Sequence, residues 1–301
     1  MGNKLITIVT PTYNRVDKLP LLYESLCRQT SMNFLWLCID DGSTDNTEEL
    51  ISTYIQKQKV SELPFSIQYI KKENGGKHSA LNVAFKEVQT ELLFIVDSDD
   101  VLTSDAIATI NEDWKQISNR NNICGIGYLR GYSVNRRIGD AYTENRAISN
   151  FIVERYNKGV DGDKAEVWVT DKLHSFQYPE VEGERFISES VAWIWLAEQY
   201  DMFFVNKIIY ITEYLTGGLS DAGRVLRFKC PNLMMYGSLM TMSKRFSLKI
   251  RIKETLLYIV YSLFGDKSLK KMVDCPYKIL VLFNLFPGYL LYKFWKTKYR
   301  I

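Results

Sequence analysis

The chain has 301 residues, and 38 lysines and arginines against 35 acids give it a formal net charge of +3. Hydrophobic residues make up 46% of it and only seven are prolines, which excludes a disordered, collagen-like or low-complexity chain. The length fits one large domain, or one domain with an appendage. A total so close to neutral argues by itself neither for nucleic acid nor for a charged surface as a partner.

The first hundred residues alternate between strand-like and helix-like segments. Apolar runs predict strands, and apolar residues at helical spacing predict helices. Strands that alternate with helices indicate right-handed β-α-β units and a mostly parallel sheet. The expected strands are residues 4–10, 34–39, 65–70 and 92–96, and the expected helices are 16–29, a segment opened by a capping box of Asp45 and Glu48 that ends near Lys57, and 78–88.

Residues 101–230 have a less regular pattern. We expect a helix over residues 104–116, then a loop-rich stretch, a helix over 190–199 and a strand over 203–211. The composition changes again near residue 231, where basic residues become frequent.

Cysteine and histidine usage bears on the compartment and on metals. The five cysteines are odd in number, widely spaced and without a C-x-x-C pair, so they fit neither a disulfide framework nor a zinc site. Two histidines are too few for a His-based metal site. The short apolar run at the N-terminus is a poor secretory signal. We therefore expect a reduced, cytoplasmic protein.

Four polar clusters accompany the four expected strands. TPTYNR, DDGSTD and DSDD come just past three of them, and ENGGKH comes just after the third strand. In parallel sheets ligands bind beyond the carboxyl ends of the strands, so we expect all four clusters along one edge. The sequence therefore predicts a ligand site at that edge.

The clusters differ in the chemistry that they offer. Asp97 and Asp99 point the same way at the end of an apolar strand, and paired carboxylates suit Mg²⁺ or Mn²⁺ beside a leaving diphosphate. The alternative is an acid-rich turn with a helix cap. Gly76 and Lys77 offer close backbone approach and a cation to a phosphate. The Walker pattern is absent, and no G-x-G-x-x-G follows the first strand, which counts against a nicotinamide enzyme.

These residues closely resemble the family 2 glycosyltransferases, inverting enzymes of the GT-A fold that use nucleotide-diphosphate sugars. The resemblance is clear over about residues 4–110 and fades to scattered features up to about 230. It implies an α/β fold with a Rossmann-like, mostly parallel sheet over residues 1–230, divided into a nucleotide-binding half (1–100) and an acceptor half (101–230). Four motifs carry it, in order: ITIVTPTYNR (6–15), IDDGSTDNT (39–47), NGGKHSALN (74–82) and LLFIVDSDD (92–100).

The resemblance also implies roles for individual residues. Asp40 would bind the base, uracil at its N3–H, and Asp41 would support that pocket. Asp99 would be the direct metal ligand, with Asp97 sharing the metal site and lying nearer the ribose. Nucleotide and donor contacts are expected from Pro11, Tyr13, Arg15, Asp40, Asp41, Gly76, Lys77, Asp97 and Ser98.

The family places a catalytic base further along, often in a Glu-Asp pair before a helix that contains Trp. Here Ser188-Glu189 stands where Glu-Asp is usual. We place the base at Glu189, because Trp193 follows four residues later, and Glu184 is the alternative. An inverting transfer needs one carboxylate to take the proton of the acceptor hydroxyl.

A glycine-containing segment follows the last expected strand. Gly217, Gly218 and Arg224 would form a lid that closes on the donor diphosphate. The alternative is a plain connection to the C-terminal region.

Residues 231–301 separate from the rest by charge. They hold 13 basic and three acidic residues, a charge of +10, whereas the first 230 residues hold 25 basic and 32 acidic residues, a charge of −7. The longest uncharged run has 14 residues and contains Pro287, short of the roughly 20 needed to span a bilayer. Basic residues around Trp, Phe and Leu indicate amphipathic helices that lie on an anionic membrane. The alternative is a helical appendage that packs on the catalytic domain or forms an oligomer.

We therefore expect an inverting glycosyltransferase that depends on Mn²⁺ or Mg²⁺ and moves a hexose or N-acetylhexosamine from a UDP-sugar. The acceptor would be a hydroxyl of a lipid-linked or growing glycan in polysaccharide biosynthesis, and nucleic acid is not an expected partner. The enzyme would lie peripherally on the inner face of the cell membrane. Two alternatives are a phosphatase of the haloacid dehalogenase type, with Asp97 as its nucleophile, and a non-catalytic scaffold that binds glycan or lipid.

Overall fold

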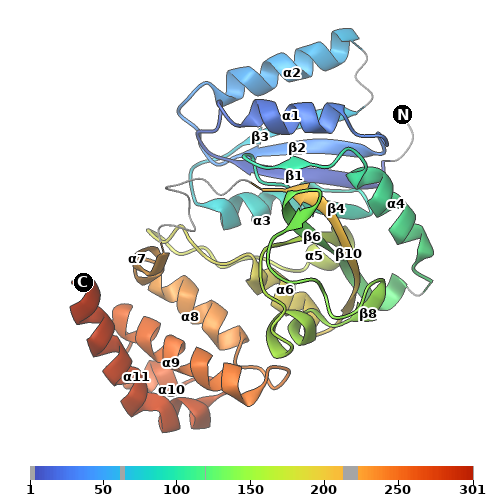
Figure 1. The fold of residues 1–301 in the computed structure, drawn as a ribbon. Coiled ribbons are helices and arrows are strands. Elements are labelled where there is room, and N and C mark those ends of the chain that lie inside the picture. Colours follow the sequence, from blue (N-terminus) through green and yellow to red (C-terminus); the bar gives the residue numbers. More distant parts are fainter. Residues whose placement is uncertain (1–3, 62–64, 119, 213–222, 301) are drawn as a thin grey trace.

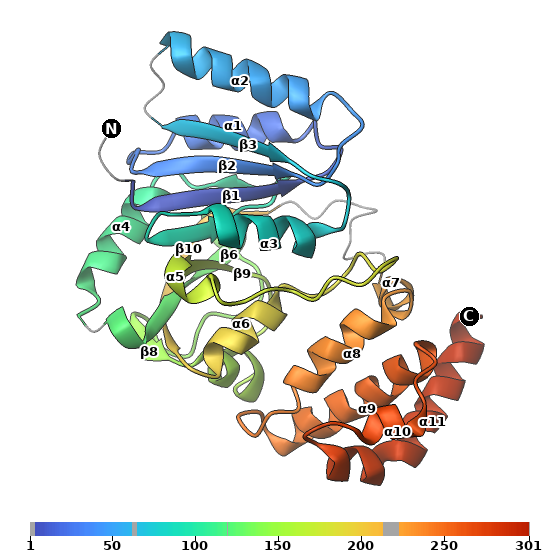
Figure 2. The ribbon, with the colours of Figure 1, turned by 180° about the vertical axis from the view of Figure 1, so that it is seen from behind.

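The computed structural model describes residues 4–61, 65–118, 120–212 and 223–300. A large sheet with helices on both faces forms one part of the molecule, and a group of C-terminal helices lies beside it (Figures 1 and 2). The strands are β1 (Ile6–Thr12), β2 (Phe34–Asp40), β3 (Ser66–Lys71), β4 (Leu92–Ile95), β5 (Val101–Leu102), β6 (Ile123–Ser133), β7 (Arg136–Arg137), β8 (Ala147–Ser149), β9 (Lys164–Val169) and β10 (Asp201–Ile211).

The helices fall into a group around the sheet and a C-terminal group. Those of the sheet part are α1 (Leu19–Cys27), α2 (Thr47–Ser61), α3 (Lys77–Glu87), α4 (Ala106–Gln116), a 3₁₀ turn η1 (Arg120–Asn122), a π-helical turn η2 (Val153–Asn157), α5 (Thr170–Leu173) and α6 (Ser190–Ala197). Those of the C-terminal group are α7 (Gly223–Phe228), α8 (Pro231–Met240), α9 (Leu248–Phe264), α10 (Leu269–Val273) and α11 (Lys278–Tyr299).

The first half of the sheet is parallel. Its strands lie in the order β3-β2-β1-β4, and each neighbouring pair runs in the same direction. All residues of β1 are buried, as expected of a parallel strand that is covered on both faces. One face packs against α1, α2 and α4, and the other packs against α3 and α6. The carboxyl ends of these strands consequently lie together at one edge.

The second half of the sheet is mixed, and here the expectation of a loop-rich stretch is wrong. β9 pairs antiparallel with both β4 and β6, so residues 123–133 and 164–169 form central strands. Glycines in β6 hid its strand pattern. A β-carbon at Gly125 would collide with the carbonyl of Val167 on β9, so the close approach of these strands requires glycine.

The C-terminal region is helical, and the predicted α/β fold with a helical appendage is confirmed. The predicted division at residue 231 coincides with the first residue of α8. However, α7, which precedes this residue, packs against α11: the ring centroid of Phe228 lies 5.5 Å from that of Trp295. The helical group joins the core of the sheet part through α6 and α8. In the described part of the chain, no helix has the length and apolar character needed to cross a bilayer.

Candidate active site

The predicted clusters meet at the carboxyl edge of the parallel strands. Thr12 at the end of β1 pairs in register with Asp40 at the end of β2, and Asp40 pairs with Lys71 at the end of β3. This register places the loops after β1, β2 and β3 side by side. The convergence that the sequence predicted is therefore present.

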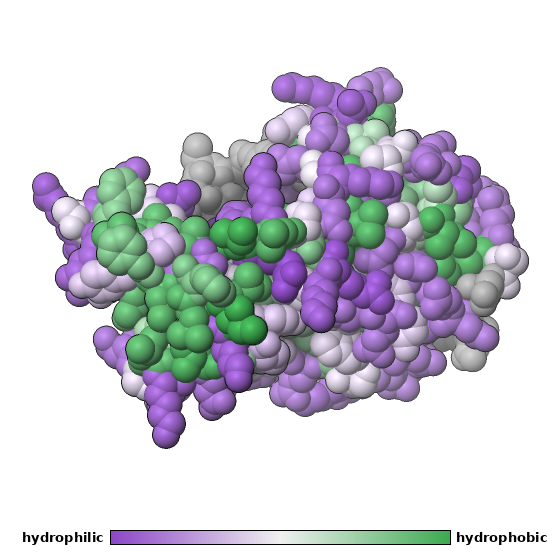
Figure 3. Space-filling view, turned by 90° about the horizontal axis from the view of Figure 1, so that it is seen from below, coloured by the Kyte–Doolittle hydropathy of each residue, from purple (hydrophilic) through white to green (hydrophobic). Residues whose placement is uncertain are grey.

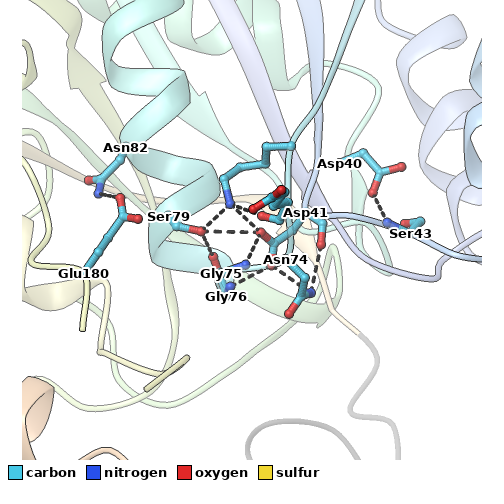
Figure 4. A network of polar contacts seen from close by, with 11 residues as sticks. Asp40, Asp41, Ser43, Asn74, Gly75, Gly76, Ser79, Asn82 and Glu180 are labelled. Atoms are coloured by element: carbon cyan, nitrogen blue, oxygen red, sulfur yellow. Dashed lines mark hydrogen bonds and ion pairs between the residues drawn. The ribbon is translucent and has the colours of Figure 1, made fainter. Parts of the chain in front are cut away.

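Asp41 fastens the loop that precedes α3 (Figure 4). Its carboxylate accepts hydrogen bonds from the backbone N–H groups of Gly75 at 2.9 Å and Gly76 at 2.7 Å, and from the ammonium of Lys72 at 3.0 Å. Gly76 has a φ of 95°, and a β-carbon there would collide with the carbonyl of Arg185. The loop conformation therefore requires glycine at position 76 and the hydrogen bonds to Asp41. These bonds are consistent with the supporting role expected of Asp41.

Asp40 is fully buried. Its Oδ1 accepts a hydrogen bond from the Ser43 N–H at 2.7 Å, and its Oδ2 accepts one from the Tyr69 hydroxyl at 2.5 Å. Burial, followed by the Asp40 carboxylate, raises the pKa of Tyr69, so this hydroxyl stays protonated as a donor. Direct contact between Asp40 and a base stays a prediction.

Two cations hold the acids at the end of β4. Lys77 forms an ion pair with Asp97, and Arg130 on β6 lies 3.6 Å from Asp97 and 3.5 Å from Asp100. Burial acts to raise the pKa of Asp97, but Lys77 and Arg130 outweigh it and lower that pKa to about 2. Burial and the charge of Asp97 raise the pKa of Asp100 to about 7 against the opposing effect of Arg130.

Arg130 and its support were missed by the sequence analysis. The Arg130 guanidinium lies 3.9 Å from the ring centroid of Tyr210 on β10, and its Nε donates to the carbonyl of Lys164 at 2.7 Å. The Tyr210 hydroxyl in turn accepts from the Asp97 N–H at 2.8 Å. An arginine within the otherwise buried run of β6 was the available signal, because a buried cation needs an anionic partner.

Glu189 joins this cluster from the acceptor half. It is the residue just before α6, and its Oε1 lies 2.6 Å from the Lys77 ammonium. Trp193 on α6 stacks on Trp168 of β9 with ring centroids 4.1 Å apart and planes within 13°. The stacked pair fixes α6 against the sheet and so sets the position of Glu189.

The alternative base, Glu184, is occupied elsewhere. It is buried, and its carboxylate accepts hydrogen bonds from the backbone N–H groups of Asn232 at 3.0 Å and Leu233 at 2.8 Å. These donors belong to the first turn of α8, where a carboxylate satisfies free N–H groups. Glu184 therefore acts as a helix cap.

The predicted metal ligands are the carboxylates of Asp97 and Asp99, which follow β4. Asp99 is half-buried, and neither a hydrogen bond nor an ion pair engages its carboxylate within the described residues, which leaves it free for a ligand. The described ranges contain no group of three or more His, Cys, Asp or Glu side chains that could hold a metal. Asp97 and Asp99 still fit Mg²⁺ or Mn²⁺, because such ions take one or two carboxylates and complete their shell with substrate phosphates.

The remaining predicted residues lie at different depths. Pro11 and Ser98 are buried, Arg15 is half-buried and Tyr13 is exposed. Arg224 lies on α7 with its guanidinium 4.7 Å from the ring centroid of Trp295 on α11, so its contact here is with the helical region. Gly217 and Gly218 lie outside the described residues, and the lid therefore stays a prediction.

The chain belongs to the family described as Glycosyl transferase family 2, which matches residues 7–164. This membership counts against a phosphatase of the haloacid dehalogenase type. The glycosyltransferase GlyG of Streptococcus pneumoniae serotype 4 is 29% identical over 131 residues, 43% of this chain and 40% of that protein. An undecaprenyl-phosphate 4-deoxy-4-formamido-L-arabinose transferase of Photorhabdus laumondii is 32% identical over 99 residues, 32% of this chain and 29% of that protein. The chain thus matches well under half the length of these relatives.

Solved structures support the fold. S. aureus TarS 1–349 in complex with UDP-GlcNAc aligns with a TM-score of 0.61 and 16% identity over 94% of this chain and 81% of that one. The mannosyltransferase PcManGT of Pyrobaculum calidifontis, in complex with GDP-Man and Mn²⁺, aligns with a TM-score of 0.57 and 14% identity over 99% of this chain and 84% of that one. At these identities the likeness establishes the GT-A-like fold alone.

Proposed function

We propose that the protein is an inverting, metal-dependent glycosyltransferase that moves a sugar from a UDP-sugar to a hydroxyl of a lipid-linked or growing glycan. The observation that carries the proposal is the cluster in which one ammonium, that of Lys77, contacts both Asp97 and Glu189. It brings an acid of the nucleotide half and an acid of the acceptor half together at the carboxyl edge of the sheet. Donor and acceptor chemistry would meet there.

The donor side consists of Asp97, Asp99 and Lys77. A bound Mg²⁺ or Mn²⁺ would neutralise charge that develops on the leaving diphosphate. The ammonium of Lys77 already pairs with two acids, and a bound diphosphate could form a further charge-assisted hydrogen bond with it. The complexes of TarS with UDP-GlcNAc and of PcManGT with GDP-Man give examples of both nucleotides among proteins of this fold. Uridine is the choice that the resemblance to the family favours.

The acceptor side consists of Glu189 and its supports. Glu189 would take the proton of the acceptor hydroxyl as that oxygen attacks the anomeric carbon and the bond to the diphosphate breaks. A single displacement of this kind inverts the anomeric configuration. With Glu184 engaged as a helix cap, Glu189 is the carboxylate better placed for this role.

One relative and the charge of the C-terminal region bear on the acceptor and the location. One relative is named as an undecaprenyl-phosphate sugar transferase, which favours a lipid-linked acceptor here. The charge of +10 on residues 231–301 favours a peripheral position on the anionic inner face of the cell membrane.

Donor choice is tested by thermal shift with UDP-, GDP- and dTDP-sugars in the presence of Mn²⁺, because the true donor stabilises by mass action. Catalysis is tested by UDP release. We expect Asp99→Ala to abolish metal-dependent release, and Glu189→Gln to keep donor stabilisation while lowering transfer by about 10²- to 10⁴-fold. Asp171→Asn, whose side chain is 95% exposed on α5, is the matched control. Full transfer by Glu189→Gln would refute the assigned base.

A further inference from the structure

Helix α11 is apolar on two opposite sides. Its inner side buries Val281, Gly288 and Trp295 at intervals of seven residues, and a β-carbon at Gly288 would lie 2.8 Å from Cγ2 of Ile259 on α9. The opposite side carries large apolar side chains that stay exposed, and Phe283 reaches 83% exposure. We call these residues the α11 outer face: Ile279, Leu282, Phe283, Phe286, Tyr289, Leu290 and Phe294.

The α11 outer face forms one continuous stripe. Apart from the adjacent pairs 282–283 and 289–290, its members recur at intervals of three and four residues, which places them on one side of a helix. Figure 3 shows the corresponding apolar patch on the C-terminal helices, with hydrophilic side chains at its rim. A contiguous apolar patch on an exposed surface marks an interaction site.

The charges around this face are all positive on α11 itself. The helix carries Lys278, Lys293, Lys296 and Lys298 and has no acid. The ammonium of Lys293 lies 5.5 Å from the ring centroid of Tyr289, and that of Lys296 lies 5.5 Å from that of Tyr292. The ammonium groups of these two lysines thus lie over aromatic rings of the same helix, and mixed lysine and aromatic side chains of this kind suit the boundary between apolar lipid and its headgroups.

We propose that the α11 outer face docks on the surface of an anionic lipid bilayer, with α11 lying in the plane of the interface. Apolar and aromatic side chains would enter the headgroup boundary, and the lysines would meet the anionic headgroups. A second copy of the chain is a poorer occupant, because a two-fold contact through this face would bring the lysines of both copies together without acids on α11 to balance them. This proposal deepens the proposed function and rests on it, because the proposed lipid-linked acceptor would lie in the same membrane.

The carboxyl edge of the sheet and the C-terminal end of α11 lie on the same side of the molecule. In Figures 1 and 2 the parallel strands point toward the side of the molecule on which α7 and the C-terminal end of α11 lie. The carboxyl edge that carries Asp97 therefore faces the same side as the end of the docking helix.

The experiment is co-sedimentation of the full chain with vesicles of phosphatidylglycerol and, separately, of phosphatidylcholine. We expect sedimentation with phosphatidylglycerol, and a loss of roughly tenfold or more in affinity for the double variant Phe283→Ser/Phe286→Ser, which removes exposed apolar surface. Lys293→Gln/Lys296→Gln should weaken binding to phosphatidylglycerol about thirtyfold, at about 1 kcal/mol for each lysine. The matched control is Leu21→Ser/Val134→Ser, because both residues are exposed and apolar but lie in the sheet part.

Three outcomes would overturn the proposal. They are no sedimentation of the unaltered protein, equal sedimentation of the outer-face variant, and a dimer in solution that the outer-face variant converts to a monomer with unchanged vesicle binding. UDP release measured on the same samples separates this proposal from the proposed function. Loss of vesicle binding with retained UDP release concerns the α11 outer face, whereas the reverse result concerns the catalytic site.

Discussion

The ammonium of Lys77 lies 2.6 Å from Oε1 of Glu189. Lys77 is the first residue of α3, and Glu189 precedes α6, so the contact joins the nucleotide half to the acceptor half. The same ammonium pairs with Asp97. Burial acts to lower the pKa of Lys77, but the two carboxylates outweigh it and raise that pKa above its usual range. The proposed base, Glu189, and the donor-side acid, Asp97, therefore share one cationic partner, Lys77.

Replacing Lys77 should weaken both the fold and the activity. We expect Lys77→Met to lower the free energy of unfolding by about 2 kcal/mol, because Asp97 and Glu189 would lose their shared partner. The kcat/KM for transfer should fall roughly hundredfold, because Glu189 would no longer be held in position. Denaturant titration and steady-state kinetics measure the two effects.

The control for this variant is another lysine–glutamate pair. Lys71 lies 2.8 Å from Glu48 at the surface, where both side chains are exposed. Lys71→Met should therefore lower the free energy of unfolding much less than Lys77→Met does. A similar loss in both variants would mean that the Lys77 pairs contribute no more than a surface pair.

Glu184 should behave as a structural residue. We expect Glu184→Gln to lower the free energy of unfolding by about 1–2 kcal/mol, because the carboxylate that accepts from the first turn of α8 is replaced by a neutral amide. Transfer per folded molecule should stay within about twofold of the unaltered enzyme. Thermal unfolding and initial rates at 25 °C measure these effects. A folded Glu184→Gln variant without transfer activity would instead identify Glu184 as the base.

The sequence predicted the parallel half of the sheet because its strands are buried on both faces and read as apolar runs. β6 and β9 were missed because other residues interrupt their apolar runs. Glycines interrupt β6, and Lys164 and Glu166 interrupt β9. The capping box also failed in part. Asp45 does accept from the Thr47 N–H at 3.1 Å, but Glu48 pairs with Lys71, because the register of β2 and β3 brings that lysine close.

The candidate site was predictable where motifs follow strands. Asp97, Lys77 and Glu189 were named from the sequence, and the structure brings them together. Arg130 was not named, because it lies on a strand that was itself missed. Its role depends on Tyr210 in β10, a contact across the sheet that no local pattern encodes.

His78 should make the stability of the protein depend on pH. It is buried, and within the described residues neither ring nitrogen has a hydrogen-bond partner. Burial lowers the pKa of His78, and Glu180, Asp41 and Lys72 modify the effect without reversing it. The folded state therefore favours the neutral imidazole, so the unfolded chain binds more protons as the pH falls below the ordinary histidine value near 6.5. The free energy of unfolding should then decrease as the pH falls through that range.

Comparison with His78→Phe isolates this contribution, because phenylalanine fits an apolar site beside Tyr178 without a titrating group. The free energy of unfolding of this variant minus that of the unaltered protein should increase as the pH is lowered from about 7.5 to about 5.5, because only the unaltered protein loses stability through His78. Denaturant titrations at several pH values in that range measure the difference. Other groups titrate equally in both proteins and cancel in the comparison. A difference that stays constant with pH would show that His78 has the same proton affinity in the folded and unfolded chain.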